Sequence, residues 1–516
     1  MAVVETRYGK VEGTSDDGVC AFKGIPFAAP PAGARRWHPP APPEPWSGIR
    51  AATEWGKQAW QQAVENAGML SFVFNIRNAA FRDEDCLQLN VFTPDADTAK
   101  RPVLVWIHGG GFQGGTGGTP VYDGSNLARR GDVVVVTVNY RVGALGWLNL
   151  NELTDGRIPA SGNEGLLDQI EALRWIRDNI ATFGGDPGNV TIFGESAGAM
   201  SVGALLASPP AKGLFHRGIL ISGATSTANT LARAVEVADG LLHKLGLSPK
   251  DDVHKLMALE PEVLIEAAAG YRVAGGGMSF QPCVDGAVVG EFPLDAVKGG
   301  AADGIPVLVG TQRDEWRGFT LNNPQTANLD DAGLLAEVSA NVEDAASLID
   351  GYRGIRAGRG DSTDPTSLFA AIETDRKMRM PAVDLAEALA ARGESAHHYI
   401  FAHESPWDGG RLGSPHAVII GFVFGTHAMS EESAAFFGTG EAADAVSAHL
   451  QDAFCRLART GSPSTDAMAD WEPYDTQTRS TGIFVDPVEV ESAPYDEERA
   501  LWVGREVSLP FGPSRW

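Results

Sequence analysis

A serine between two glycines is the first place in this chain of 516 residues where chemistry can be expected. It lies in Gly194-Glu195-Ser196-Ala197-Gly198, directly after the apolar run 190–193 and before the small-residue stretch 199–207. A nucleophilic serine must stand at the end of a strand, on a turn so tight that side chains two residues away would clash. Although the pattern alone could be an ordinary turn, its place between a strand and a helix predicts that Ser196 is a nucleophile for acyl transfer.

A glycine-rich loop could supply the second requirement of acyl transfer. The tetrahedral intermediate carries a negative oxygen, which needs amide donors fixed in advance. His108-Gly109-Gly110-Gly111-Phe112 follows the apolar run 103–107 and matches a pattern that serves this purpose next to a nucleophilic serine. We predict that the donors are the amides of Gly110, Gly111 and Ala197. The alternative is a merely flexible loop, which the glycines at 114–118 could form.

The serine also needs a base, and the base needs a carboxylate that orients it. Histidine is the usual base, and the pattern alone does not choose among the histidines that follow Ser196. These are His216, His243, His254, His397, His398, His403, His416, His427 and His449. For each of them, a surface or core position is the alternative interpretation.

The elements that must position these residues alternate along the middle of the chain. Continuous apolar runs suit strands that are covered on both faces. Such runs occur at 103–107, 133–138, 190–193, 218–221 and 305–309. Apolar residues at helical spacing predict helices over 166–183 and 441–460, which glycines end. Strand and helix in alternation predict an α/β fold with a central, mostly parallel mixed sheet and helices on both faces. No boundary stands out, so we expect a single domain, 1–516, with large insertions.

Several further motifs, with the glycine loop and the serine, occur in an order that is specific for one family. They are Ala21-Phe-Lys-Gly-Ile-Pro-Phe-Ala28, Glu84-Asp-Cys-Leu-Gln-Leu-Asn90, Asn139-Tyr-Arg-Val-Gly143, Gly165-Leu-Leu-Asp-Gln169 and Phe183-Gly-Gly-Asp-Pro187. With them, most of the chain resembles the type-B carboxylesterases, the family of bacterial para-nitrobenzyl esterases, animal carboxylesterases and cholinesterases. The resemblance implies an α/β-hydrolase fold, a Ser-His-Glu catalytic triad and no metal or organic cofactor.

The resemblance also assigns the acid and the base. The acid of the family lies in a segment like Gly310-Thr-Gln-Arg-Asp-Glu315, which implies Glu315, whereas the neighbouring Asp314 is expected to be structural. The base precedes a segment ending in Phe-Val-Phe-Gly, which implies His416, with His403 as the reserve candidate.

Three further assignments follow from the resemblance, for Ser222 and two ion pairs, and one follows from the position of Glu195 beside the nucleophile. Ser222 matches a serine that supports the acid from behind, although it could also be a turn residue. Glu195 could orient a water or favour a cationic group, or only cap its turn. Two ion pairs, Arg36 with Glu84 and Arg141 with Asp168, would fix loops near the site.

Composition limits the partners. The chain has 41 Lys and Arg against 66 Asp and Glu, a net charge of −25. A field of this sign repels phosphate backbones and anionic lipids, so we expect neither nucleic acid nor membrane as a partner. It mildly favours neutral or cationic substrates, unless local charge near the site overrides the total. The oligomeric state is not predictable from the sequence.

The expected location follows from the cysteines and the beginning of the chain. Four scattered cysteines suit reduced thiols and no disulfide framework. The sequence after Met1 has no basic head followed by an apolar run, so we expect no secretory signal. These features favour the cytoplasm, and with the resemblance to bacterial members of the family we expect a cytoplasmic, bacterial enzyme.

The predicted function is therefore that of a serine carboxylesterase, which hydrolyses small-molecule carboxylic esters through an acyl-enzyme. One alternative is hydrolysis of amides, carbamates or lactones at the same site, since the leaving group depends on pocket shape. Another is a non-catalytic binding protein on the same fold. Such proteins typically lose a member of the triad, and here all three are present.

Overall fold

A single large sheet runs through the molecule. The computed structural model describes residues 1–62, 81–272 and 277–505. In these residues one sheet of 13 strands has the order β1-β2-β3-β5-β7-β6-β8-β9-β12-β13-β14-β15, with β4 paired to β2. Its strands are β1 (Ala2–Thr6), β2 (Gly9–Asp16), β3 (Val19–Pro26), β4 (Ile49–Ala51), β5 (Gln88–Thr93), β6 (Arg101–Ile107), β7 (Val134–Val138), β8 (Gly185–Glu195), β9 (Arg217–Ile221), β12 (Val307–Gln312), β13 (Ala396–Phe401), β14 (Ser480–Phe484) and β15 (Glu489–Ser492).

The middle of the sheet is parallel and its flanks are antiparallel. Neighbours from β7 through β6, β8, β9, β12 and β13 to β14 all pair in parallel. The strands β1, β2, β3 and β5 on one flank, and β15 on the other, pair antiparallel. The carboxyl ends of the parallel strands therefore meet along one edge, where the loops that follow them can converge.

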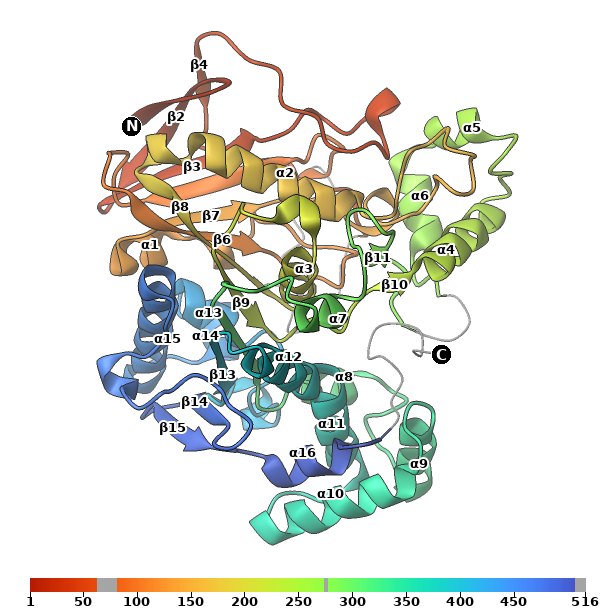
Figure 1. Cartoon of the computed structure of the whole chain (residues 1–516), viewed down its shortest axis with the longest axis vertical. Helices are drawn as coiled ribbons and strands as arrows, with labels where there is room; N and C mark the ends of the chain where they lie inside the picture. Colours follow the sequence, from red (N-terminus) through yellow and green to blue (C-terminus); the bar gives the residue numbers. More distant parts are fainter. Residues whose placement is uncertain (63–80, 273–276, 506–516) are drawn as a thin grey trace.

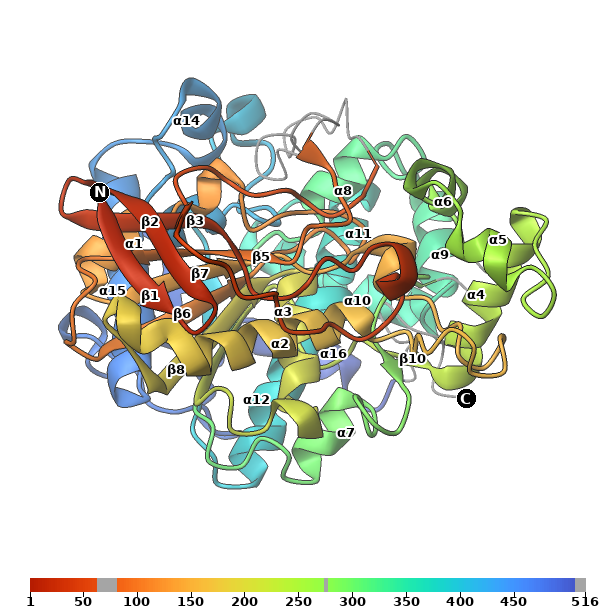
Figure 2. The same cartoon turned by 90° about the horizontal axis from the view of Figure 1, so that it is seen from above.

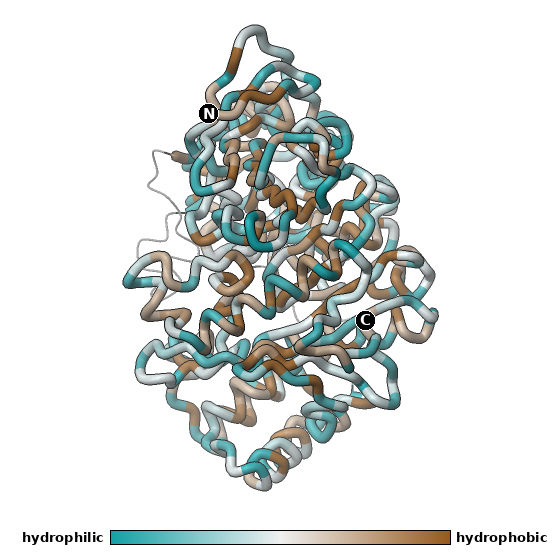
Figure 3. The backbone as a smooth tube through the Cα atoms, turned by 90° about the vertical axis from the view of Figure 1, so that its left-hand side faces the viewer, coloured by the Kyte–Doolittle hydropathy of each residue, from teal (hydrophilic) through white to brown (hydrophobic). Residues whose placement is uncertain are grey.

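Both faces of the parallel strands are buried under helices, as the continuous apolar runs predict. In β6, Val103, Val105 and Ile107 belong to one hydrophobic cluster, whereas Leu104 and Trp106 belong to another. The first cluster lies under α2, α3 and α12, and the second lies under α13 and α15. Figure 3 shows hydrophobic segments running through the interior of the molecule.

Helices both cover the sheet and form insertions at its ends. The sixteen in the described ranges are α1 (Ser125–Gly131), α2 (Glu164–Asn179), α3 (Ala197–Leu206), α4 (Leu231–Lys244), α5 (Val253–Met257), α6 (Pro261–Ala268), α7 (Pro293–Lys298), α8 (Arg317–Asn322), α9 (Asp331–Ser339), α10 (Ala345–Arg359), α11 (Pro365–Thr374), α12 (Met380–Ala391), α13 (Ile420–Phe424), α14 (Glu431–Phe437), α15 (Glu441–Thr460) and α16 (Asp496–Trp502). Figure 2 shows α4, α5 and α6 at the opposite end of the molecule from β1 and β2. A short pair, β10 (Asn229–Thr230) and β11 (Cys283–Val284), joins the ends of this insertion.

The fold class and the predicted elements are confirmed, with small shifts at the ends. The helix predicted over 441–460 is α15, and the helix predicted over 166–183 is α2 followed by a 3₁₀ turn, Ile180–Phe183. Each of the predicted strands is present. All four cysteines are free and buried. Among the described residues, no helix combines the length and the apolar character that crossing a membrane requires.

Candidate active site

Ser196 stands at a strained turn between β8 and α3, as the pattern predicts. Its backbone has φ 56° and ψ −124°, and its amide donates to the carbonyl of Ile221 at 2.9 Å. The turn brings backbone atoms too close for side chains at the flanking positions. A Cβ on Gly194 would lie 2.6 Å from the carbonyl oxygen of Gly198, and one on Gly198 would lie 2.0 Å from that of Ile107. The two glycines are therefore required by contact, and the hydroxyl of Ser196 is held at the edge of the sheet.

The loop after β6 presents free amides beside Ser196. In the part of the chain that the structure describes, the amides of Gly110, Gly111 and Ala197 have no hydrogen-bond acceptor. All three residues line the same cavity as Ser196. Gly110 has φ 115° and Gly111 has φ 61°, both in the region that favours glycine. Three free amides at one cavity could therefore bind the negative oxygen that acyl transfer produces.

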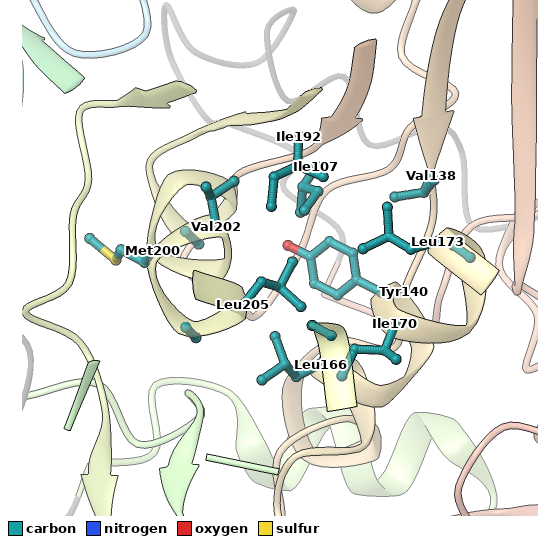
Figure 4. Close-up of a cluster of buried hydrophobic side chains, with 14 of the residues drawn as sticks. Ile107, Val138, Tyr140, Leu166, Ile170, Leu173, Ile192, Met200, Val202 and Leu205 are labelled. Carbon is teal, nitrogen blue, oxygen red and sulfur yellow. The ribbon is translucent and has the colours of Figure 1, made fainter. Parts of the chain in front are cut away.

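Buried polar contacts hold this loop in place. The hydroxyl of Tyr140 donates to the carbonyl of His108 at 2.7 Å, and the two rings stack 4.3 Å apart. Figure 4 shows Tyr140 among aliphatic side chains of β6, β8, α2 and α3, including Ile107 and Leu205. At the other end of the loop, the side chain of Gln61 donates to the carbonyl of Gly115 at 3.0 Å and accepts from its amide at 2.7 Å. No motif pointed to Gln61, which lies far from the loop along the chain.

Glu315 and His416 lie in direct contact. Oε2 of Glu315 is 2.6 Å from Nδ1 of His416, and both side chains are buried. Two further contacts join their segments: Asp314 N donates to the carbonyl of Ser414 at 2.9 Å, and Ser414 N donates to the Asp314 carboxylate at 3.0 Å. A carboxylate on Nδ1 leaves Nε2 of the imidazole to act toward the cavity.

The other ring nitrogen of His416 contacts Glu195, which the sequence did not predict. Nε2 lies 3.1 Å from Oε1 of Glu195. Within the described residues no hydrogen bond joins it to the hydroxyl of Ser196, although both residues line the same cavity. Burial disfavours the charged imidazole, but Glu195 and Glu315 outweigh it and raise the pKa of His416. Burial likewise raises the pKa of Glu195 above its usual range. In this arrangement His416 is held between two carboxylates.

Ser222 reaches the acid through a glutamine. Its hydroxyl hydrogen bonds to the side-chain amide of Gln312. When the amide nitrogen of Gln312 faces Glu315, it lies 3.1 Å from Oε2 of that carboxylate. The backbone amide of Gln312 also donates to Oε1 of Glu315 at 2.7 Å. Gln312 was not predicted from the sequence. The signal that could have identified it was its position on β12, the strand that leads to Glu315.

Both predicted ion pairs are present, the pair of Arg141 fully buried and the pair of Arg36 largely buried. Arg36 binds the two oxygens of Glu84 at 2.6 Å each, and Arg141 binds those of Asp168 at 2.8 and 2.7 Å. Arg36 also donates to the carbonyls of Met257 and Leu259, which precede α6. The first pair therefore fixes the insertion that contributes one wall of the cavity.

The reserve candidates lie elsewhere. His403 lines a shallow surface pocket with Trp407 and is not among the residues of the cavity at Ser196. Asp314 forms ion pairs with Arg313 and Arg317, each at 2.9 Å, which supports the structural interpretation. His397 and His398 are buried on β13. In the described ranges, no group of three His, Cys, Asp or Glu could hold a metal ion.

A cavity of about 490 Å³ opens over Ser196. Its floor consists of the glycine loop, Ser196 and Ala197, and His416 lies at its side. Much of the remaining lining is apolar, from two segments that follow α5 and β12. A cavity of this size can hold a small organic substrate with its carbonyl against the free amides.

Known proteins are similar to the chain over nearly all of its length. The model of the Carboxylesterase family matches residues 1–502. The chain is 38% identical over 506 residues to the para-nitrobenzyl esterase of Bacillus subtilis, which covers 96% of this chain and 97% of that protein. It is 32% identical over 483 residues to the phenmedipham hydrolase of Pseudarthrobacter oxydans, with 92% of each chain covered.

Solved structures agree with these matches. The crystal structure of a carboxylesterase of Geobacillus stearothermophilus at pH 6.2 superposes with a TM-score of 0.86. It is 38% identical and the match covers 97% of this chain and 99% of that one. A structure of a PNB esterase superposes with a TM-score of 0.82 at 36% identity, over 97% and 99% of the two chains.

Proposed function

The chain belongs to the carboxylesterase family and is a serine hydrolase of carboxylic esters with an α/β-hydrolase fold, and we propose that Ser196, His416 and Glu315 are its catalytic triad. The observation that carries this proposal is the contact of 2.6 Å between the buried Glu315 and His416, which lines the same cavity as Ser196. Conversely, family membership disfavours the alternative of a non-catalytic binding protein.

The proposed reaction has two steps. The Ser196 hydroxyl attacks the ester carbonyl carbon while Nε2 of His416 takes its proton, and the amides of Gly110, Gly111 and Ala197 stabilise the negative oxygen. Collapse of this intermediate breaks the bond to the alcohol, which leaves with the proton from His416. Water, which loses a proton to the same histidine, then attacks the acyl-enzyme and releases the carboxylic acid.

In the free enzyme Nε2 of His416 lies against Glu195, so this reaction requires that the imidazole turn toward Ser196. Catalytic hydrogen bonds are often poorly aligned in the absence of substrate and tighten in the complex. The contact between Nδ1 and Glu315 can persist during such a turn, because it lies on the opposite side of the ring. Glu195 is then a positioning residue for the base, and Ser222 acts on Glu315 through Gln312.

The test is the Ser196→Ala variant. Turnover of a para-nitrophenyl ester should fall by roughly 10⁴-fold or more, because the nucleophile is lost while the rest of the site remains. Ser201→Ala is a matched control, since Ser201 lies on the same helix outside the cavity lining. Covalent labelling by a fluorophosphonate should disappear only in the first variant. Hydrolysis at the wild-type rate by Ser196→Ala would remove the nucleophile assignment. Rapid turnover of amides that match the esters in structure would reveal an amidase.

We also propose that the enzyme acts as one domain in the cytoplasm of a bacterium. The single sheet, which takes strands from Ala2 to Ser492, supports one domain. The four free, buried cysteines suit a reducing compartment. Bacillus subtilis and Pseudarthrobacter oxydans supply two of the similar proteins. Activity found in the culture medium of the source cells instead of their soluble extract would contradict this location.

A further inference from the structure

The cavity over Ser196 has one wall that is almost entirely apolar. This wall brings together the helix α6, the chain that follows it and the segment around α8. Its apolar side chains are Ile265, Met278, Phe280, Trp316, Phe319 and Met378. Such a surface can hold an unbranched or aromatic part of a substrate, but it cannot orient a charged one.

One charged side chain interrupts this wall. Arg272 lines the cavity, and apart from His416 it is the one titratable side chain among the described residues that do so. This contrasts with the chain as a whole, whose net charge is −25. Arg272 therefore places a positive charge at the cavity, opposite in sign to the net charge of the chain, and salt screens charges that lie further away.

The guanidinium of Arg272 has N–H donors available for a ligand. Its Nη1 donates to the carbonyl of the neighbouring Tyr271 at 3.0 Å. In the described part of the chain no carboxylate lies within 4.0 Å of it, whereas Arg36 and Arg141 each bind a carboxylate with two nitrogens. An arginine presents five N–H donors in a planar fork that matches a carboxylate. Arg272 is thus exposed, unpaired by a carboxylate and placed at the cavity.

The segment that carries Arg272 is fixed at its base. Gly270 turns the chain with φ 61° after α6, and the hydroxyl of Ser279 donates to the carbonyl of Tyr271 at 2.9 Å. Further back, Arg36 holds the chain before α6 through the carbonyls of Met257 and Leu259. These contacts keep the backbone of Arg272 close to the cavity while its side chain can adjust to a ligand.

We propose that Arg272 is a specificity residue that binds a carboxylate on the substrate, separated from the scissile ester by an apolar spacer. The inference rests on the proposed function, because the ester is placed by Ser196 and the oxyanion amides. The spacer lies along the apolar wall, and the carboxylate pairs with the guanidinium. The preferred substrates are esters that carry one negative charge remote from the reacting carbonyl, such as half-esters of dicarboxylic acids.

The experiment compares two series of para-nitrophenyl esters, one of alkanoates and one of ω-carboxyalkanoates of matched chain length. We expect the ratio of kcat/KM for the charged ester to that for its neutral partner to pass through a maximum at one spacer length. In Arg272→Gln this ratio should fall about ten-fold, near the lower end of what a hydrogen bond to a charged group contributes. In Arg272→Glu it should fall further. Arg177→Gln, which removes a charge from the surface of α2, should leave the ratio unchanged.

Salt provides a second readout. Raising ionic strength from about 0.1 M to about 1 M shortens the Debye length from about 10 Å to about 3 Å, so the wild-type ratio should fall and that of Arg272→Gln should change less. A ratio that is the same in wild type, Arg272→Gln and Arg272→Glu would overturn the inference, as would a wild-type enzyme that does not turn over the charged series. Failure of the proposed function is distinguishable, because it would show as hydrolysis of neutral esters by Ser196→Ala.

Discussion

At the scale of single residues, the site depends on glycines whose missing Cβ atoms make room for backbone. Gly109 is one example, since a Cβ there would lie 2.8 Å from the carbonyl oxygen of Glu195 and 3.2 Å from the Cβ of Ser196. The glycine loop after β6 and the turn at Ser196 can approach each other only because neither has a Cβ at the points of contact. In the proposed mechanism, this close approach brings amides of two separate segments to one oxygen.

Gly110→Ala tests this requirement. A Cβ on Gly110 would lie 2.3 Å from the carbonyl oxygen of Gly114, and φ 115° is a strained value for alanine. The loop must therefore shift and misplace its amides, so kcat/KM for a neutral ester should fall by roughly 10²–10³-fold. Gly118→Ala is the matched control in the same loop, because the nearest atoms lie 3.5 Å from its Cβ. Equal activity of the two variants would show that the amide of Gly110 does not act on the oxyanion.

The sequence predicted which residues come together, but not all of their contacts. The motif around Ser196, with the family resemblance that implied Glu315 and His416, made their proximity predictable: Ser196 and His416 line one cavity, and Glu315 contacts His416. The contact of Glu195 with His416 was not, because a motif does not state where the side chain beside a nucleophile points. Gln312 was missed for the same reason: its side-chain amide contacts Glu315, just beyond its own strand β12, and Ser222, which follows β9.

At the scale of elements, the loops at the strand ends are fixed by buried ion pairs. Arg141 follows β7, and its partner Asp168 lies on α2 with no exposed side-chain surface. The Asp168 carboxylate also accepts from the backbone amide of Arg141 at 3.0 Å. The pair therefore connects a strand end, a helix and the loop that leads to Gly143 in the cavity lining.

Asp168→Ala should destabilise the fold by about 3–5 kcal/mol, because it leaves the charge of Arg141 buried without a partner. Urea unfolding followed by tryptophan fluorescence measures the change. Asp178→Ala on the same helix is the control: its partners Arg7 and Arg177 are largely exposed, so the loss should be about 1 kcal/mol or less. Similar losses in the two variants would contradict a special role of burial.

Not every strand was predictable. Continuous apolar runs predicted β6, β7, β8, β9 and β12. These strands lie in the middle of the sheet and are buried on both faces. The strand β13 is equally buried, but His397 and His398 interrupt the apolar run by which a buried strand is recognised. The flanking strands β1 and β2 have one exposed face and many polar residues, so their pattern is weak.

At the scale of the whole molecule, these buried histidines link stability to pH. Burial, with Arg379 nearby, lowers the pKa of His398 to about 3, and burial lowers that of His397 to about 4. In an unfolded chain histidine titrates near pH 6.5. Below that pH these two histidines are protonated in the unfolded chain but stay neutral in the folded chain. Their contribution to the free energy of unfolding therefore decreases as the pH falls.

His398→Phe should reduce this dependence. Between about pH 7.5 and about pH 5, the proton uptake of one unfolded histidine costs the wild type about 2 kcal/mol, and the variant avoids that cost. Urea unfolding at both pH values gives the change in the free energy of unfolding with pH for each protein. This change should be smaller in the variant than in the wild type. Thr481, which contacts His398, keeps its hydrogen bond to the carbonyl of Arg479. His243→Phe, at an exposed position on α4, should leave the pH dependence unchanged, and an equal change in both variants would contradict the prediction.

The residues proposed for catalysis and those proposed for substrate selection lie on separate segments of the chain. This separation affects how the substrate specificity can change. The proposed reacting groups follow strands of the sheet or sit in loops pinned to them, whereas Ile265, Arg272 and Phe280 belong to an excursion between β9 and β12. Substitutions in that excursion can exchange one substrate for another and leave the chemistry intact. Directed evolution for new esters should therefore accumulate its changes there, with the catalytic strand ends remaining untouched.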